Sequence, residues 1–229
     1  MRTVYLHADH DVRVEEAPEP VLLTGPDASG RDAIVRVVAS CVCGSDLWGY
    51  RGIRQSGEAR PMGHEFVGVV EAVGDAVATV KAGDFVIAPF YICCGTCLNC
   101  RNGVSTSCLN GGWWGGEVKG EGRADAGQGE RVRVPLADGT LVVVPGGEPD
   151  PALIPGLLTL SDVMCTGHHA AVSGGVAPVR SYIEELLPEV LDGRIRPGLV
   201  FDLELPLSEA ASAYAAMDER RAVKVLLRP

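Results

Sequence analysis

The sequence has no uninterrupted apolar run long enough to cross a bilayer, and residues 1–10 carry no apolar core flanked by basic residues. It is also short of positive charge, because 20 basic residues stand against 30 acidic ones and leave a net charge of −10. Such a surface repels phosphate groups, so nucleic acid and membranes are not expected partners. We expect a cytoplasmic protein.

Long stretches of helical periodicity are also few, whereas glycine occurs 29 times and proline 15 times. This composition favours a mainly β body with peripheral helices. Gly68, inside one apolar run, indicates a bend of a small curled barrel. Asp138-Gly139 predicts a hairpin turn. The expected strands are 12–15, 34–38, 66–72, 84–89, 131–135, 141–144, 199–205 and 223–228; the expected helices are 157–171, 181–191 (closed by Gly193) and 208–219 (capped by Ser208).

Four of the eight cysteines form an irregular lobe over 93–110 with the spacing C-x2-C-x2-C-x7-C: Cys94, Cys97, Cys100 and Cys108. Four thiolates close a tetrahedral shell around Zn²⁺, and such a closed shell is structural. Cys93 offers an alternative first ligand, but Cys94 leaves Gly95 directly after the ligand and keeps the next two gaps equal. Reduced surface thiols or two disulfides are the alternative, although a chain of this length does not need a disulfide scaffold.

A second group of candidate ligands comprises Cys43-Gly44-Ser45-Asp46 and, about twenty residues later, Gly63-His64-Glu65. On spacing alone, a buried cysteine and a loop histidine are the commoner explanation. Together with Phe66-Val67-Gly68 and the four-cysteine lobe, in this order, the motifs resemble the zinc-dependent alcohol dehydrogenases of the medium-chain dehydrogenase/reductase family. The resemblance implies a GroES-like, partly open β-barrel with a zinc-binding lobe.

The resemblance also implies roles for individual residues. Cys43 and His64 would bind a catalytic zinc, Glu65 would be a further ligand or a nearby carboxylate, and Asp46 would hold the His64 imidazole. Ser45 would accept the substrate proton. Asp162, in a segment that resembles the one leading to the family's cofactor domain, is the expected third ligand, with Cys165 or no protein ligand as alternatives. His168 and His169 are expected to pack against the barrel, outside the metal shell.

Trp48 departs from the family pattern, and each of the three tryptophans has two possible locations. Trp48 stands where many members carry a histidine that passes the proton to solvent, so the relay ends at Ser45, runs through water or uses another group. Trp48, Trp113 and Trp114 either line a hydrophobic substrate cleft or belong to the core.

A dinucleotide-binding motif is missing. No G-x-G-x-x-G lies between a strand and a helix, and residues 173–180, the one linker-like stretch, are too few for a βαβ unit. Since residues 175–229 resemble the family's return from its cofactor domain, we interpret the chain as a single GroES-like domain, 1–229, without a Rossmann domain. Its N-terminal part is 1–172, its junction 173–180 and its C-terminal part 181–229.

The functional hypothesis is a zinc-binding catalytic domain of an alcohol-dehydrogenase-like oxidoreductase that acts on an alcohol or aldehyde. The family implies NAD(P), but without its binding domain we expect no NAD(P)-dependent turnover by the chain alone. The alternatives are a non-catalytic zinc scaffold and an enzyme that receives its cofactor domain from another chain. The oligomeric state is not predicted.

Overall fold

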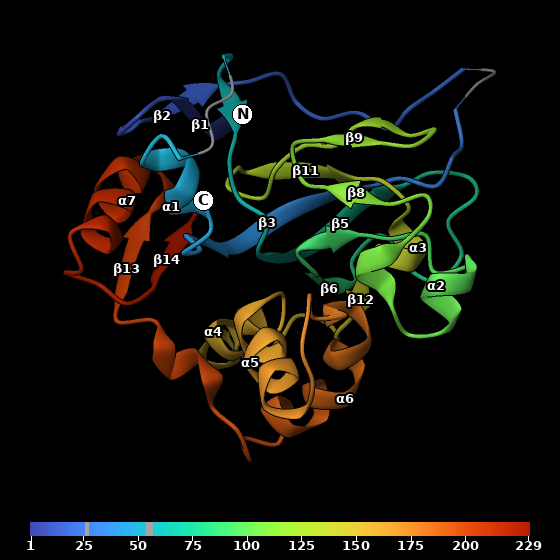
Figure 1. Ribbon diagram of the computed structural model, residues 1–229. Coiled ribbons are helices and arrows are strands. Elements are labelled where there is room, and N and C mark those ends of the chain that lie inside the picture. Colours follow the sequence, from blue (N-terminus) through green and yellow to red (C-terminus); the bar gives the residue numbers. More distant parts are fainter. Residues whose placement is uncertain (26–27, 54–56) are drawn as a thin grey trace.

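The computed structural model describes residues 1–25, 28–53 and 57–229. Its centre is a seven-stranded sheet in which neighbouring strands follow the order β12-β6-β5-β3-β14-β13, with β11 also paired to β3. This confirms the predicted mainly β body (Figure 1). The strands are β3 (Ala33–Cys41), β5 (Phe66–Val73), β6 (Phe85–Ala88), β11 (Arg131–Val134), β12 (Val142–Val143), β13 (Leu203–Pro206) and β14 (Val225–Arg228).

Gly68 lies where β5 bends against β3. The register shifts between Val37 and Ala39, opposite Gly68 and Val67, which marks a bulge. A Cβ at position 68 would lie 2.2 Å from Arg36 O, so only glycine fits this close approach of two backbones. The bend expected at Gly68 is therefore present.

Smaller sheets surround the central one (Figure 1). The N-terminal sheet pairs the first two strands with a short third one, and two-stranded ribbons border the cysteine lobe. These strands are β1 (Arg2–Ala8), β2 (Asp11–Glu16), β4 (Arg60–Pro61), β7 (Tyr91–Ile92), β8 (Gly112–Trp113), β9 (Glu117–Val118) and β10 (Gly122–Arg123).

The helices lie at the periphery, with α4 to α6 grouped on one side of the sheet and α7 beside β13 and β14 (Figure 1). The α-helices are α1 (Asp46–Tyr50), α2 (Leu98–Arg101), α3 (Ala137–Thr140), α4 (Ile154–Thr159), α5 (Val163–Val172), α6 (Val179–Leu191) and α7 (Ala210–Asp218). The 3-10 helices are η1 (Ser105–Ser107), η2 (Pro151–Leu153), η3 (Pro197–Val200) and η4 (Leu207–Glu209). No helix among the described residues is long and apolar enough to span a membrane.

The helix predicted over 157–171 is wrong as a single element, because it breaks between α4 and α5. Ser161 Oγ donates to Leu158 O at 2.6 Å, and Ser161 O accepts from Phe90 N at 2.9 Å. Asp162, with φ −156° and ψ −78°, leaves the helical region. The break turns Asp162 out of the helix.

Four further features differ from the sequence predictions. Asp138-Gly139 lies in α3 and makes no hairpin, since β11 pairs with β3 and β12 with β6. The strand predicted from 199 begins only at Leu203, after η3, and the final strand begins at Val225. Ser208 lies in η4, and Glu209 precedes α7. The end of α6 agrees with the prediction, because Gly193 (φ +69°) donates to Val190 O at 3.1 Å.

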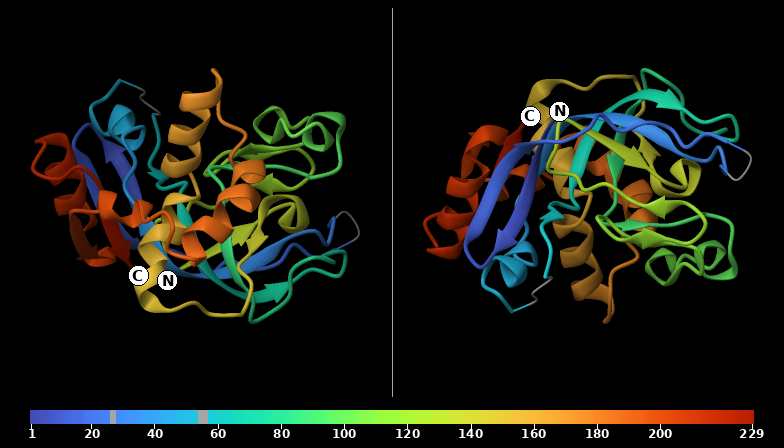
Figure 2. Two further views of the ribbon diagram at one scale, coloured as in Figure 1. Left: turned by 90° about the horizontal axis from the view of Figure 1, so that it is seen from below. Right: turned by 90° about the horizontal axis from the view of Figure 1, so that it is seen from above.

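Helices α5 and α6 meet at the short segment 173–178. Residues 173–176 are exposed, and α5 stands out from the body of the molecule (Figure 2). His169 Nδ1 and Tyr182 OH lie 2.9 Å apart, and the His168 ring packs edge-on against Tyr182. The histidine pair therefore contacts α6 instead of the barrel, because the break at Asp162 redirects α5.

The packing of α4 against the sheet can be tested at Leu157. Its side chain is fully buried in the cluster that joins α4 and α6 to β5 and β6. We expect Leu157→Ala to lower the free energy of unfolding by about 2–5 kcal/mol. Leu199→Ala is the control, since Leu199 is 78% exposed. Chemical denaturation compares the two variants, and equal losses would contradict the packing described here.

Candidate metal centres

The four cysteines of the lobe lie together in the structure. Each offers a sulfur atom, and all four sulfurs lie within 4.8 Å of one another. The residues come from the loop after β7, from α2 and from the end of η1. Gly95 (φ +71°) and Gly103 (φ +77°) supply left-handed turns between them. All eight cysteines are free, so no disulfide links any of them. The first ligand position is taken by Cys94 and not by Cys93. The four sulfurs of the group are those of Cys94, Cys97, Cys100 and Cys108.

Hydrogen bonds to sulfur lower the pKa of Cys94 and Cys97, whereas burial raises the pKa of Cys100 and Cys108. Burial raises the pKa of Cys94, but hydrogen bonds from Asn110 and Thr96 outweigh it and lower the pKa to about 5. Backbone N–H groups of Cys94 and Asn110 point at Cys108 Sγ, at 3.2 and 3.4 Å. Cys93 differs, because burial raises its pKa to about 12 and its thiol donates to Gly139 O at 3.0 Å. The Cys94 sulfur thus belongs to the group of four and is favoured as a thiolate, whereas the Cys93 thiol is engaged with the backbone at Gly139.

A second group of donors lies at the end of the central sheet. Cys43 follows β3, His64 and Glu65 directly precede β5, and Asp162 lies at the break between α4 and α5. Their donor atoms also lie within 4.8 Å of one another. Asp162 Oδ2 is 3.6 Å from both Cys43 Sγ and His64 Nε2. One sulfur, one nitrogen and two carboxylates form a donor set that suits Zn²⁺.

The charges of this group are strongly coupled. Burial acts against the charged form of His64, but Asp46, Asp162 and Cys43 outweigh it and raise the pKa of the imidazole well above its usual value. Burial likewise opposes ionisation of Asp162, yet hydrogen bonds from His64 and Thr166 lower the pKa of its carboxyl. Burial raises the pKa of Cys43. The site thus concentrates acidic donors that a cation would balance.

Glu65 is the most deeply placed of these donors. Its side chain is fully buried, and Oε1 accepts from Lys224 Nζ at 2.8 Å. Lys224, which directly precedes β14, also donates to Val42 O at 3.3 Å. Glu65 Oε2 is buried without a hydrogen-bond partner. A buried carboxylate oxygen without a donor is costly unless a cation compensates it, so the residues present fit a metal at this place.

Ser45 and Asp46 flank the histidine on opposite sides. Ser45 Oγ is exposed and lies 3.5 Å from His64 Nε2. Asp46 Oδ1 lies 3.3 Å from His64 Nδ1, and Asp46 Oδ2 accepts from Cys43 N at 2.9 Å. The structure therefore brings together every residue expected at the second site, whereas Cys165 stays outside it and donates its thiol to Leu160 O.

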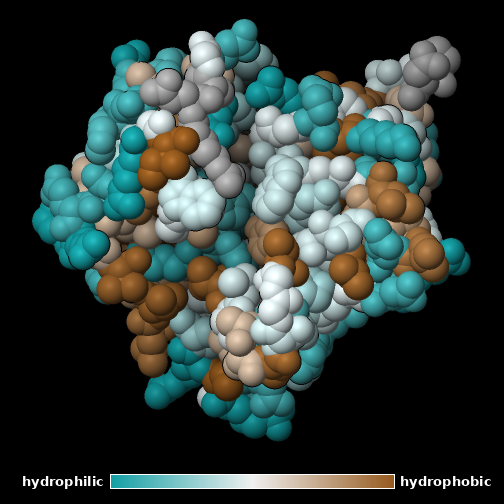
Figure 3. Space-filling view, viewed as in Figure 1, coloured by the Kyte–Doolittle hydropathy of each residue, from teal (hydrophilic) through white to brown (hydrophobic). Residues whose placement is uncertain are grey.

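The tryptophans occupy different environments. Trp114 belongs to the core and not to a cleft wall, since it is 9% exposed, packs edge-on against Phe66 and donates Nε1–H to Pro89 O at 2.9 Å. Trp48 and Trp113 are 45% and 57% exposed, and Trp113 stacks on Phe90. The face that carries α1 and β8 is hollowed between these two elements (Figure 3).

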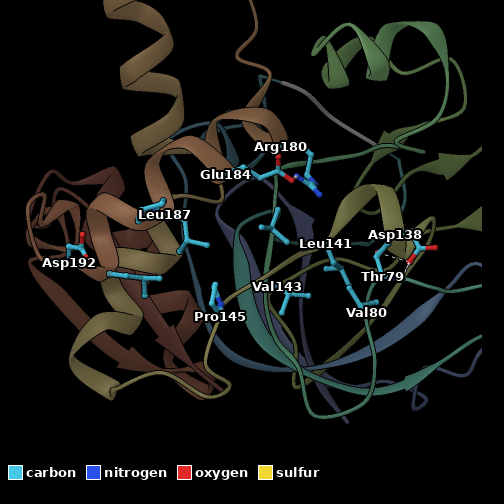
Figure 4. Close-up of a pocket in the computed structure, with 13 residues that line it drawn as sticks. Thr79, Val80, Asp138, Leu141, Val143, Pro145, Arg180, Glu184, Leu187 and Asp192 are labelled. Atoms are coloured by element: carbon cyan, nitrogen blue, oxygen red, sulfur yellow. Dashed lines mark hydrogen bonds and ion pairs between the residues drawn. The ribbon is translucent and has the colours of Figure 1, made fainter.

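A separate cavity of about 650 Å³ lies between α6 and the β12 side of the sheet (Figure 4). Its walls are mainly aliphatic, with Leu141, Val143 and Leu187 among them, and none of the candidate metal ligands lines it. Its charged groups already have partners: Arg180 pairs with Glu184 at 2.6 Å, Asp192 with Arg194 at 3.1 Å, and Asp138 accepts from the Thr79 hydroxyl at 2.7 Å. We therefore assign it no part in the metal chemistry.

Sequence reasoning missed three residues around the second group: Lys224, Gln128 and Tyr214. Lys224 carried a usable signal, because it stands between the apolar Val223 and Val225 at the start of the strand predicted over 223–228, where a buried lysine requires a partner. Gln128 lies in a loop and Tyr214 on a helix, and neither stands in a recognisable motif.

Comparison with known proteins identifies related chains. Residues 29–146 match the family of alcohol dehydrogenase GroES-like domains. Zinc-type alcohol dehydrogenase B of Aspergillus flavus is 37% identical over 171 residues, which cover 75% of this chain and 37% of that protein. Glutathione-independent formaldehyde dehydrogenase of Pseudomonas aeruginosa is 37% identical over 186 residues, covering 73% of this chain and 43% of its own length. The chain thus spans about half or less of these relatives.

Solved structures show the same fold. The alcohol dehydrogenase TADH from Thermus sp. ATN1 superposes with a TM-score of 0.85 at 22% identity, and the alignment covers 100% of this chain and 99% of that one. A second match, galactitol-1-phosphate dehydrogenase from Escherichia coli, has a TM-score of 0.71 at 15% identity, with 100% of each chain covered.

The pair of Glu65 and Lys224 yields a stability prediction. Lys224→Met leaves the buried Glu65 carboxylate without its cation, so we expect the free energy of unfolding to fall by about 3–5 kcal/mol. The double variant Lys224→Met/Glu65→Gln removes both charges and should regain much of that loss. Chemical denaturation, after a chelator has removed the labile metal from all samples, measures both. A double variant no more stable than the single one would contradict the pairing.

Proposed function

We propose that this chain, which belongs to the zinc-dependent medium-chain alcohol dehydrogenase family, is an oxidoreductase catalytic domain with one structural and one catalytic zinc site. The observation that carries the proposal is the convergence of Cys43, His64, Glu65 and Asp162 within 4.8 Å, with a buried Glu65 oxygen left unpaired. Four thiols in the lobe leave no open ligand position, whereas this mixed group does. The lobe is therefore assigned to structure and the mixed group to chemistry.

In this proposal Cys43, His64 and Asp162 hold the catalytic zinc, and Glu65 is a fourth ligand or exchanges with water. Bound zinc acts as a Lewis acid that lowers the pKa of a substrate alcohol. Ser45, exposed beside His64 Nε2, takes the alcohol proton and passes it to solvent. Trp48 supplies no imidazole for a longer relay. Asp46 orients His64 through Nδ1.

The substrate proposed is a small alcohol or aldehyde. The matching relatives include a zinc-type alcohol dehydrogenase and a glutathione-independent formaldehyde dehydrogenase. The exposed faces of Trp48 and Trp113 offer apolar surface for the carbon part of such a substrate. A small uncharged substrate also suits a chain of net charge −10, which would repel an anionic one.

The cofactor is proposed to be NAD(P) in the complete family enzyme, but not to bind to this domain alone. In support, the one parallel pair of strands that the described sheets contain is β13 with β14, and no glycine-rich strand-to-helix turn precedes it. Helices α5 and α6 are joined by 173–178, which leaves no room between them for a dinucleotide-binding domain. We therefore keep 1–172 and 181–229 as two parts of one domain, with 173–180 as the junction.

Zinc stoichiometry tests the two sites. We expect two zinc ions per chain, of which a chelator removes one readily, because structural zinc contributes apparent binding energies of about 10–16 kcal/mol. Cys43→Ser should abolish the labile zinc alone, and Cys97→Ser should lower thermal stability or yield. Elemental analysis before and after chelation reads both. A protein without tightly held zinc would contradict the structural assignment.

Cofactor titration tests whether this domain binds NAD(P) alone. NADH and NADPH, followed by fluorescence, should show no saturable binding to the chain, because the pyrophosphate-binding turn and helix are missing. Added alcohol should then give no NAD(P)-dependent oxidation. Micromolar binding would contradict the proposed loss of the cofactor domain. The absence of a labile zinc as well as of binding would instead favour a non-catalytic zinc scaffold.

A further inference from the structure

Gln128 connects the second metal group to the C-terminal segment of the chain. Its side chain is fully buried. Nε2 donates to Cys41 O at 3.0 Å and to Asp46 Oδ2 at 3.3 Å, and Oε1 accepts from Tyr214 OH at 2.9 Å. Asp46 Oδ1 in turn lies 3.3 Å from His64 Nδ1. A continuous series of hydrogen bonds therefore runs from α7 to the candidate ligand His64.

One backbone carbonyl fixes which group donates and which accepts at each hydrogen bond of this series. Cys41 O can only accept a hydrogen bond, so the Gln128 amide must present its NH₂ group there and its oxygen to Tyr214. The tyrosine hydroxyl must then donate. Asp46 receives bonds from Gln128 and from the backbone of Cys43, which leaves its other oxygen to accept from His64 Nδ1–H. His64 Nε2 is thereby left to face Asp162 Oδ2 at 3.6 Å.

The backbone locks Gln128 against the segment that carries His64. Gln128 N donates to Met62 O at 2.9 Å, and Gly127 N donates to Gly63 O at 2.8 Å. Gly63 has φ +97°, and a Cβ there would lie 2.5 Å from Gln128 Cγ. A side chain at position 63 would push the two segments apart, so glycine is what permits the amide to reach Asp46.

We propose that Gln128 and Tyr214 are positioning residues of the catalytic metal site. They hold the Asp46 carboxylate in one orientation, and this orientation keeps Nδ1–H of His64 bonded to Asp46 and Nε2 free to bind metal. The inference rests on the proposed function, because it takes His64 as a metal ligand. Neither residue touches the ligand group directly, and each acts through Asp46.

This arrangement makes the site depend on both sides of the junction. Tyr214 on α7 and Lys224 before β14 follow the junction, whereas Asp46, His64 and Glu65 precede it. From the C-terminal segment, the Tyr214 hydroxyl donates to Gln128, and Lys224 supplies the cation that pairs with Glu65. The ligands of the N-terminal part are held in place only when that segment has docked.

Cobalt binding tests the proposal. Gln128→Met keeps the size of the side chain and removes its amide, Tyr214→Phe removes one oxygen, and Tyr50→Phe is the control, since its ring packs against Tyr214 outside the hydrogen-bonded series. Competition with a chelator gives the affinity of the labile cobalt, and the solvent exchange of the shifted Nδ1–H signal of His64 gives a readout independent of activity.

We expect Gln128→Met to weaken the labile cobalt site by about 10- to 100-fold and to speed exchange of the Nδ1–H proton. Tyr214→Phe should have a smaller effect of the same kind, and Tyr50→Phe none. The double variant should lose no more affinity than Gln128→Met alone, because Tyr214 acts through Gln128. Cobalt in the four-cysteine lobe should be unaffected throughout.

Unchanged affinity and exchange in Tyr214→Phe and Gln128→Met would overturn the positioning role while leaving the proposed function intact. If the losses of cobalt affinity add up in the double variant, Tyr214 does not act through Gln128, and the proposed order of the hydrogen-bonded series is wrong. If Gln128→Met does not fold, Tyr214→Phe decides, and wild-type affinity with wild-type exchange overturns the proposal. A wild-type protein that binds cobalt only in the lobe would contradict the proposed function itself.

Discussion

A carboxylate buried at the end of the central sheet sets the main constraint on this protein. Glu65 is fully buried, and the lysine that pairs with it, Lys224, lies 159 positions along the chain. An unpaired charge in that place would cost several kcal/mol, so β14, which directly follows Lys224, must pack beside β3 for the carboxylate to be tolerated. The pairing of β14 with β3 provides that contact. The pairing that adds the C-terminal strand to the sheet therefore also places the cation beside the carboxylate.

The two metal groups differ in how much of the fold they need. The lobe cysteines lie within a span of 15 residues, and their glycine turns and N–H···S contacts are local. The second group draws on the end of β3, the start of β5 and the break before α5, and its hydrogen-bonded support extends to α7. A metal bound in the lobe would accordingly stabilise a local loop, whereas a metal bound by the second group would depend on the docking of the whole chain.

Sequence patterns predicted what depends on neighbours along the chain. The cysteine spacing places the lobe ligands, and alternation places most strands, because both signals are local. The Asp138-Gly139 hairpin failed for the opposite reason: its two flanking strands pair with β3 and β6, a choice set by distant residues. The helix break at Ser161 and Asp162 likewise depends on Phe90, whose backbone N–H donates a hydrogen bond to Ser161 O. Resemblance indicated Asp162, but Lys224 and Gln128 required the three-dimensional structure.

Anomalous diffraction at the zinc absorption edge tests the account most directly, because it locates metal without assuming ligands. Two peaks per chain are predicted, one among the sulfurs of the lobe and one in contact with Cys43 Sγ, His64 Nε2 and an Asp162 oxygen. A single peak in the lobe, from crystals grown with excess zinc, or a second peak bound by other residues would contradict it.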